Sequence, residues 1–376
     1  MHICLVYDCL FPWTVGGAER WYRNLGERLA AEGHRVTYLT LRQWDSPPDI
    51  PGVDVVAVGP RMALYRDGKR RIAPPLRFGL GVLAHLAAHG RRYDVVHTAS
   101  FPYFSLLAAA AARPFGGYRI VCDWHEVWSD NYWSEYLGAL GWVGGLVQRL
   151  CARVPQRAYA FSRLHAERLR GLGLAEVTRL TGEYAGTGGG EVQQLWSDPP
   201  TIVYAGRFIP EKRVDLLVEA LPIAREAIPG LRARLIGSGP TLHAAEVRIA
   251  SLGLSDIVEC PGFLPPEAVD AAMREAFCVV QPSSREGYGM VVIEASARGV
   301  PAVVVAAEDN AATELIDEGR NGFVVPGPDP ILLAEAIVGC WHGGPDLRVA
   351  TLGWYRENEE RLSLEGSLRT VSAAYK

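Results

Sequence analysis

The sequence predicts an α/β protein that consists of two doubly wound domains, each built around a parallel sheet. Short apolar segments rich in Val and Ile alternate with helical segments along nearly the whole chain. Apolar runs of this kind are typical of parallel strands that are buried on both faces. The alternation fails once, at 182–200, where glycine, proline and polar residues indicate a linker. A length of 376 residues suits two domains.

The first half begins with a strand at 2–8 (HICLVYD) and a helix at 18–33 that ends at Gly33. Glycine is a common helix terminator because it tolerates the left-handed backbone conformation. Further strands are expected at 35–41, 53–59, 93–99 and 119–125. The order of strands and helices therefore predicts a doubly wound sheet in this half.

The second half repeats the pattern after the linker. Strands are expected at 201–206, 233–239, 256–262, 277–283 and 301–307, with helices between them and a helical final segment at 345–376. We predict Rossmann-like domains at 1–185 and 186–354, with a C-terminal helix, about 355–376, that packs back on the first domain. Two such sheets that face each other place the carboxyl ends of their strands on a common cleft, where ligands bind.

Composition narrows the function classes. The net charge of −4 gives no general electrostatic basis for nucleic acid binding, so we expect no nucleic acid partner. The seven cysteines form no CxxC pair and no cluster with histidine, which fits a reducing compartment. The N-terminus lacks the pattern of a signal peptide, and no apolar run reaches the roughly 18 residues of a membrane span. We therefore expect a cytoplasmic protein.

A pair of cations follows the first strand of the second half, in GRFIPEK. Arg207 and Lys212 lie just after the predicted strand, and a helix is expected to begin near Val214. Two cations beside a helix N-terminus can bind a diphosphate, with Arg as a bidentate donor and Lys as a point charge. The alternative is a solvated pair of loop charges.

A second motif, EGYGMVVIE, follows the strand at 277–283. Glu286 lies in the loop, Gly287 and Gly289 shape the turn, and a helix is expected from about Met290 through Glu294. The backbone amides of four residues would face a ligand: Tyr288, Gly289, Met290 and Val291. The alternative is that Glu286 only favours the helix dipole and Glu294 is an ordinary exposed helix residue.

Two candidate positions lie in the first half. Gly16 and Gly17 precede the first helix and would let the backbone approach a ligand, although no GxGxxG dinucleotide motif is present. His125 lies at the end of the strand at 119–125, in CDWHEVW, beside Asp123 and Glu126. A helix entry turn and a structural histidine are the alternatives at these positions.

These motifs, in this order, resemble the family 4 retaining glycosyltransferases of the GT-B fold, which use nucleotide sugars. The resemblance covers essentially the whole chain and is most specific at GRFIPEK and at EGYGMVVIE. It implies two Rossmann-like domains that face each other across a cleft. The chain departs from the family pattern at 181–190, where the family often has an N-G turn and a short linker, and at 306–316.

The resemblance implies specific roles for the donor-binding residues. Arg207 and Lys212 would neutralise the donor diphosphate, with the backbone of Gly16 and Gly17 beside the same phosphates. Glu286 would hold hydroxyls of the transferred hexose. For the rest of the site, the resemblance implies that Glu294 binds the ribose hydroxyls and that the backbone near Phe263 contacts the base. It also implies that His125 contacts the donor sugar near the reaction centre.

The sequence features of the predicted acceptor site are less specific than those of the donor site. Aromatic residues cluster at 124–136, with Trp124, Trp128, Tyr132 and Trp133 as candidates for stacking on an acceptor and loop packing as the alternative. A basic segment at 65–77 and an apolar segment at 137–150 are consistent with peripheral contact to an anionic membrane at its inner face. The expected acceptor is a sugar, a lipid-linked molecule or a small metabolite.

The predicted reaction is transfer of a hexosyl group, with retention, from a nucleoside diphosphate sugar, preferably UDP-linked, to a hydroxyl acceptor. The catalytic set would be His125, Arg207, Lys212 and Glu286. No Asp-x-Asp motif lies in a suitable place, so we expect no metal and no other cofactor. Two alternatives are a non-hydrolysing nucleotide-sugar 2-epimerase and a non-catalytic nucleotide-sugar-binding protein.

Overall fold

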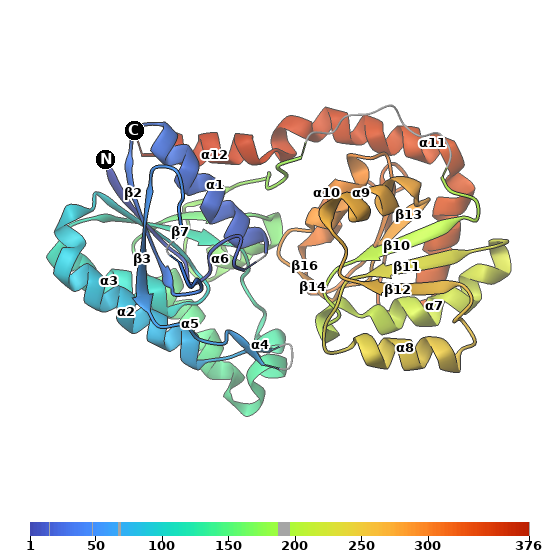
Figure 1. The fold of residues 1–376 in the computed structure, drawn as a ribbon, viewed down its shortest axis with the longest axis horizontal. Coiled ribbons are helices and arrows are strands. Elements are labelled where there is room, and N and C mark those ends of the chain that lie inside the picture. Colours follow the sequence, from blue (N-terminus) through green and yellow to red (C-terminus); the bar gives the residue numbers. More distant parts are fainter. Residues whose placement is uncertain (15, 47, 67–68, 187–195, 376) are drawn as a thin grey trace. The chain divides into compact units, whose positions relative to one another are not determined.

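The computed structural model describes residues 1–376 except 15, 47, 67–68, 187–195 and 376, and it does not describe the side chains of 65–70 (Figure 1). The described chain divides into two units. Unit 1 comprises Met1–Glu183 and Glu365–Lys376, and unit 2 comprises Tyr184–Leu364. Unit 1 therefore consists of two segments of the sequence, and unit 2 lies between them in the sequence. The second segment begins at Glu365, about ten residues after the start of about 355 predicted for the C-terminal helix.

Unit 1 contains a seven-stranded sheet in the order β3-β2-β1-β6-β7-β8-β9, and every neighbouring pair is parallel. The five strands predicted in this half are confirmed. Two short strands, β8 and β9, were not predicted, because runs of four and three residues are too short for a periodicity. The strands are β1 (His2–Val6), β2 (Arg35–Leu41), β3 (Val53–Gly59), β6 (Val95–Ala99), β7 (Arg119–Trp124), β8 (Arg157–Ala160) and β9 (Val177–Arg179), with a small hairpin of β4 (Tyr65–Arg66) and β5 (Lys69–Arg70).

The helices of unit 1 cover both faces of this sheet. The connections through α2, α3 and α5 run in one direction along the strand order, whereas the connection through α1 runs in the other. Because such connections are right-handed, α1 lies on the opposite face of the sheet from α2, α3 and α5, as Figure 1 shows. The helices are α1 (Gly17–Ala31), α2 (Ala73–His89), α3 (Phe104–Gly116), α4 (Asp130–Leu137), α5 (Gly141–Ala152), α6 (Arg163–Gly171) and α12 (Leu364–Ala373), with short 3₁₀ turns at Gly90–Arg92 and Gly138–Leu140.

The C-terminal segment of unit 1 is anchored beside α1 and in the core. Arg28 of α1 forms an ion pair with Glu365 at 2.7 Å. At the other end of the segment, the Tyr375 hydroxyl lies 2.5 Å from Nδ1 of His97, whose Nε2 lies 2.8 Å from Oδ1 of Asp123. Burial opposes the ionisation of Asp123, but the neighbouring His97 outweighs this effect and holds the pKa of the carboxyl below its usual range.

Unit 2 contains a six-stranded parallel sheet in the order β12-β11-β10-β13-β15-β17. The five strands predicted in this half are confirmed, and the short strand β17 was not predicted. The strands are β10 (Thr201–Ala205), β11 (Arg232–Ile236), β12 (Val258–Gly262), β13 (Cys278–Gln281), β15 (Ala302–Val305) and β17 (Gly322–Val325). The two remaining strands, β14 (Arg285–Glu286) and β16 (Asp309–Asn310), pair with each other.

The helices of unit 2 are α7 (Val214–Ala227), α8 (Leu242–Ser251), α9 (Pro266–Glu275), α10 (Met290–Ser296) and α11 (Pro330–Leu362), with 3₁₀ turns at Pro210–Lys212 and Ala311–Leu315. Helix α11 is broken at Gly344, which has a φ of 56° and precedes a proline. The predicted helical segment at 345–376 is therefore the second part of α11 followed by α12. Residues 187–195 of the predicted linker at 182–200 lie outside the described residues.

Candidate functional site

Two loops of unit 2 lie side by side at one edge of its sheet. One follows β10 and carries Arg207 and Lys212, and the other follows β13 and carries Glu286. Strands β10 and β13 are parallel neighbours, so their carboxyl ends lie together. The backbone N–H of Ser284 donates to the carbonyl of Glu211 at 2.8 Å, which ties the two loops directly.

Lys212 and Glu286 form the closest charged contact between these loops. The ammonium lies 2.5 Å from Oε1 of Glu286, and the Ser283 hydroxyl donates to the same oxygen at 2.7 Å. Only 17% of the Lys212 side chain and 16% of the Glu286 side chain are exposed. The structure thus brings together two residues that the sequence analysis selected separately, and it adds Ser283, which lies at the strand end and was not selected.

Arg207 differs from Lys212 in its surroundings. It is exposed, and its guanidinium forms no ion pair with the residues that the structure describes. Its backbone carbonyl accepts a hydrogen bond of 2.8 Å from the hydroxyl of the buried Tyr204. The loop therefore holds the backbone of Arg207 in place and leaves a positive charge available to an anion.

The neighbouring loop after β11 explains part of the glycine pattern. Gly237 has a φ of 138°, and a Cβ there would overlap the carbonyl oxygen of Gly206. The N–H of Phe208 donates to the carbonyl of Ser238 at 2.9 Å across the same contact. Glycine thus allows this loop to pack against the loop of Arg207, and it ends the strand predicted at 233–239 three residues early.

Asn310 fixes the loop of Glu286 from the other side. The β14–β16 ladder aligns Glu286 with Asn310. The buried amide of Asn310 donates to the carbonyls of Ser283 at 2.9 Å and Val305 at 2.8 Å, and its oxygen accepts from the N–H of Ala312 at 3.0 Å. With its amide engaged in this way, Asn310 positions the loop that carries Glu286.

The turn into α10 has the form that the sequence predicted. Gly289 has a φ of 105°, which favours glycine, and a Cβ there would lie 2.7 Å from Cβ of Ala312. Tyr288 is buried, whereas Gly287, Met290 and Val291 are half-buried. Glu294 is half-buried on α10, and its backbone carbonyl accepts a hydrogen bond from Arg298. The Phe263 side chain, after β12, is 78% exposed.

In unit 1, Gly16 caps α1 and Gly17 is its first residue. A Cβ on Gly16 would overlap Oε2 of Glu19, whereas a Cβ on Gly17 would meet no atom within 4 Å. The surroundings of Gly17 in unit 1 therefore leave its backbone accessible, as contact with a ligand requires.

His125, just after β7, is held by a carboxylate and by aromatic rings. Its Nδ1 lies 3.6 Å from Oε1 of Glu183, its ring stacks on Phe161 at 4.4 Å, and its buried Nε2 has no hydrogen-bond partner among the described residues. Burial disfavours the imidazolium, but the carboxylates of Glu183, Asp123 and Glu126 outweigh it, and the pKa of His125 is raised above 6.5. Glu183 was missed because it lies in the segment interpreted as a linker.

The aromatic residues after β7 form a packed cluster. Trp124 is fully buried and donates from Nε1 to Gln156 at 3.0 Å. Trp128 packs against Trp133 at 4.6 Å and Tyr132 at 4.7 Å, and all three are at most 7% exposed. This arrangement corresponds to the loop-packing alternative, because little of these rings is accessible to an acceptor.

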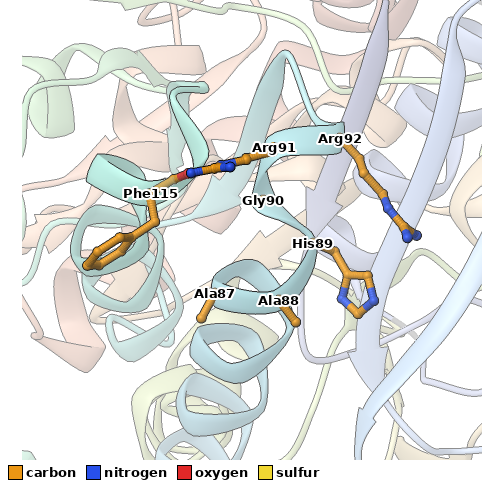
Figure 2. Close-up of a pocket in the computed structure, with 7 residues that line it drawn as sticks. All are labelled: Ala87, Ala88, His89, Gly90, Arg91, Arg92 and Phe115. Carbon is orange, nitrogen blue, oxygen red and sulfur yellow. The ribbon is translucent and has the colours of Figure 1, made fainter.

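Two further features of the described residues bear on metal and ligand binding. Among the described residues, no group of three or more His, Cys, Asp or Glu is arranged to hold a metal ion. A hollow of about 540 Å³ lies at the end of α2 in unit 1 and contains none of the predicted site residues (Figure 2).

The structure combines two units, each built on a parallel sheet with helices, and a pair of loops that lie together at the strand ends of unit 2. Family models match both units: glycosyltransferase family 4 at residues 15–180 and glycosyl transferases group 1 at residues 191–344. The chain is 31% identical to a D-inositol 3-phosphate glycosyltransferase of Actinosynnema mirum over 95% of this chain and 93% of that protein. The chain belongs to glycosyltransferase family 4, and it is a transferase with the GT-B fold.

Other similarities are more partial or concern the fold alone. A GDP-mannose-dependent α-(1-6)-phosphatidylinositol monomannoside mannosyltransferase of Mycolicibacterium smegmatis is 34% identical, but over only 37% of this chain and 38% of that protein. Sucrose-phosphate synthase from Thermosynechococcus elongatus superimposes with a TM-score of 0.80 at 20% identity, over 100% of this chain and 98% of the other. Anabaena HepE, solved with UDP-glucose, has a TM-score of 0.75 at 17% identity, over 100% and 99% of the two chains.

Proposed function

We propose that this glycosyltransferase moves a hexosyl group from a UDP-linked sugar to a hydroxyl acceptor, with retention at the anomeric carbon and without a metal ion. The observation that carries the proposal is the contact between Lys212 and Glu286, with the exposed Arg207 on the same loop as Lys212. One loop pair thus presents two cations for a diphosphate and a carboxylate for sugar hydroxyls.

The departing diphosphate needs positive charge. A guanidinium binds phosphate oxygens through two parallel hydrogen bonds, and an ammonium acts as a compact point charge. Preorganised charges stabilise the charge that develops on a leaving group without reorganisation at the moment of reaction. In the proposed site, Arg207 and Lys212 supply this charge, which is why no metal ion is required.

Glu286 has a second task in the proposed site. The pair with Lys212 and the hydrogen bond from Ser283 both use Oε1. Oε2 can then accept hydrogen bonds from hydroxyls of the hexose. Glu294, eight residues further along, is proposed to accept from the ribose hydroxyls, so that the two carboxylates hold opposite ends of the donor.

The proposed chemical step needs no protein nucleophile. The bond between the anomeric carbon and the diphosphate oxygen breaks, and a bond to the acceptor oxygen forms on the same face of the sugar. The acceptor proton moves to the leaving phosphate oxygen, which balances the reaction. The barrier is lowered by stabilisation of the diphosphate and by holding donor and acceptor in contact.

The choice of UDP rests on the sequence resemblance. One partial relative is named for GDP-mannose and one structural neighbour was solved with UDP-glucose. The test is calorimetric titration of UDP, GDP and ADP, followed by turnover with the matching sugar donors. Tightest binding of UDP and acceptor-dependent UDP release support the proposal, whereas preference for GDP overturns the base assignment. Interconversion of the donor without an acceptor would instead indicate an epimerase.

A further inference from the structure

The helices on one face of the unit 1 sheet expose apolar stripes to solvent. On α2, Phe78, Val82 and Leu86 are buried against the sheet, and the other side of the helix exposes Leu76, Leu80 and Leu83. On α5 the exposed stripe comprises Trp142, Leu146 and Leu150. These residues recur every three or four positions, so each set lies along one side of its helix. We call these six residues the apolar helix face.

The exposure of this face is large for a soluble surface. Leu80 is 60% exposed and Trp142 is 66% exposed. The half-buried and exposed positions of α3, which lies between α2 and α5 in the sequence of crossovers, include Leu107, Ala110, Ala111 and Pro114 beside Arg113. Grouped exposed apolar residues of this kind mark an interaction site, whereas single exposed residues do not.

The charges on the three helices α2, α3 and α5 have one sign. Helices α2, α3 and α5 contain no Asp or Glu, but each contains one arginine: Arg77, Arg113 and Arg149. Arg71 precedes α2, and Arg153 follows α5. Arg149 has an acidic partner on another helix, since it lies 3.2 Å from Asp130 of α4. Both side chains are highly exposed, and ion pairs of this kind contribute little.

The net charge of the chain conceals this distribution. Unit 1 contains 24 Lys and Arg against 17 Asp and Glu, whereas unit 2 contains 14 against 25, which together give the 38 and 42 of the whole chain. Unit 1 is therefore basic by seven charges and unit 2 is acidic by eleven. A basic face with exposed apolar residues is complementary to a surface that is both apolar and anionic.

The end of α2 adds a shallow site of the same character. The hollow of about 540 Å³ is lined by the methyl groups of Ala87 and Ala88, the ring of Phe115, and the side chains of Arg91 and Arg92 (Figure 2). Arg91 donates from Nε to the carbonyl of Phe115 at 3.2 Å. Apolar groups and guanidinium groups again lie side by side.

We propose that the apolar helix face docks on the surface of a bilayer that contains anionic lipids. Leu and Trp side chains insert at the boundary between headgroups and acyl chains, and the arginines contact lipid phosphates. A second copy of the chain fits less well, because a two-fold contact would bring the arginines of these acid-free helices against each other. The proposal is independent of the donor and of the reaction.

No helix among the described residues combines the length and the apolar character that crossing a bilayer requires. The proposed contact therefore lies on the membrane surface and depends on both apolar insertion and charge. It should weaken when anionic lipid is omitted and when salt screens the arginines.

The test is co-sedimentation of the full chain with vesicles of phosphatidylcholine alone or with about one third phosphatidylglycerol, at low and high salt. The variants are Leu80→Gln/Trp142→Gln on the apolar helix face and Arg77→Gln/Arg153→Gln beside it. Val247→Gln is the matched apolar control, since Val247 is exposed on α8 of unit 2, and Arg225→Gln is the matched cationic control on α7.

We expect the wild-type chain and both controls to bind the anionic vesicles. Each double variant should bind them about tenfold more weakly. All the changed side chains are exposed, so thermal unfolding should be unaltered. Absence of wild-type binding, or equal binding by the double variants, overturns the proposal. Loss of a concentration-dependent dimer in the Leu80/Trp142 variant, without vesicle binding by the wild type, would assign the face to a protein contact instead.

Discussion

Lys212 and Glu286 lie 2.5 Å apart, nitrogen to Oε1, although 74 positions separate them in the sequence. The contact joins the loop after β10 to the loop after β13, and it gives each charge a partner within unit 2. Removing either residue therefore leaves the other as an uncompensated, half-buried charge. This coupling decides how variants of the two loops should behave.

Lys212→Ala should weaken binding of free UDP more than Arg207→Ala does. Each change removes a charge-assisted contact worth about 1.5–3 kcal/mol, but loss of Lys212 also leaves the Glu286 carboxylate to repel the phosphates. Calorimetry with UDP measures both effects, and Arg225→Ala, an exposed cation on α7, is the control. Unchanged affinity in both variants would remove the diphosphate assignment.

Glu286→Gln should lower turnover with the sugar donor more than it lowers affinity for the free nucleotide. The amide cannot balance Lys212, and it accepts hydroxyl hydrogen bonds less strongly than a carboxylate does. Glu294→Ala should weaken binding of UDP and of the UDP sugar alike, because its proposed contact is to the ribose. If both variants change the two affinities in the same ratio, the carboxylates do not hold opposite ends of the donor.

His125→Ala should reduce turnover by roughly 10²-fold, in the range of a contact made in the transition state, and change UDP affinity little. The measurements are steady-state turnover and UDP titration, with circular dichroism to verify the fold. An unfolded variant would assign His125 to the packing of unit 1. A folded variant with normal turnover would exclude His125 from the reaction.

The stability of unit 1 should carry a pH dependence that originates at His125. Because its folded pKa is raised above the unfolded value of 6.5, its contribution is fully present below pH 6.5 and is lost as the pH rises through the folded pKa. The charges that face it are those of Glu183, Asp123 and Glu126. The difference in free energy of unfolding between wild type and His125→Gln should therefore be larger at pH 5.5 than at pH 9. The control is His342→Gln, since His342 is exposed and belongs to unit 2.

Removal of divalent metal ions should leave turnover largely intact. Arg207 and Lys212 provide the charge that a metal ion would otherwise supply to the diphosphate. The measurement is turnover after treatment with EDTA and gel filtration, with and without added Mg²⁺ or Mn²⁺. A loss that either ion restores would contradict the metal-independent mechanism.

Much of the fold could be predicted because buried parallel strands have an uninterrupted apolar composition. The strands β1, β10 and β15 are of this kind, and each was predicted. In contrast, β8 is the four-residue segment RAYA and pairs only because its neighbours in the sheet supply the ladder. Short strands of this kind are set by tertiary context and not by local sequence.

The candidate site shows the same division between local and tertiary information. Arg207, Lys212 and Glu286 were selected because strand ends in doubly wound sheets bind ligands. The contact between Lys212 and Glu286 could not be predicted, since it depends on which strands are neighbours. The Trp124 and Trp128 rings show the converse, because a local aromatic cluster does not reveal that packing buries it.

The division of unit 1 into Met1–Glu183 and Glu365–Lys376 has a consequence for co-translational folding. A ribosome synthesises all of unit 2 before it reaches the segment that carries Tyr375. Until then, His97 in the unit 1 core lacks the hydroxyl that lies against it in the finished protein. Unit 2, whose strands are continuous in the sequence, can complete its core while unit 1 is still waiting for its last helix. The order in which the two units mature is therefore the reverse of the order in which they begin to emerge.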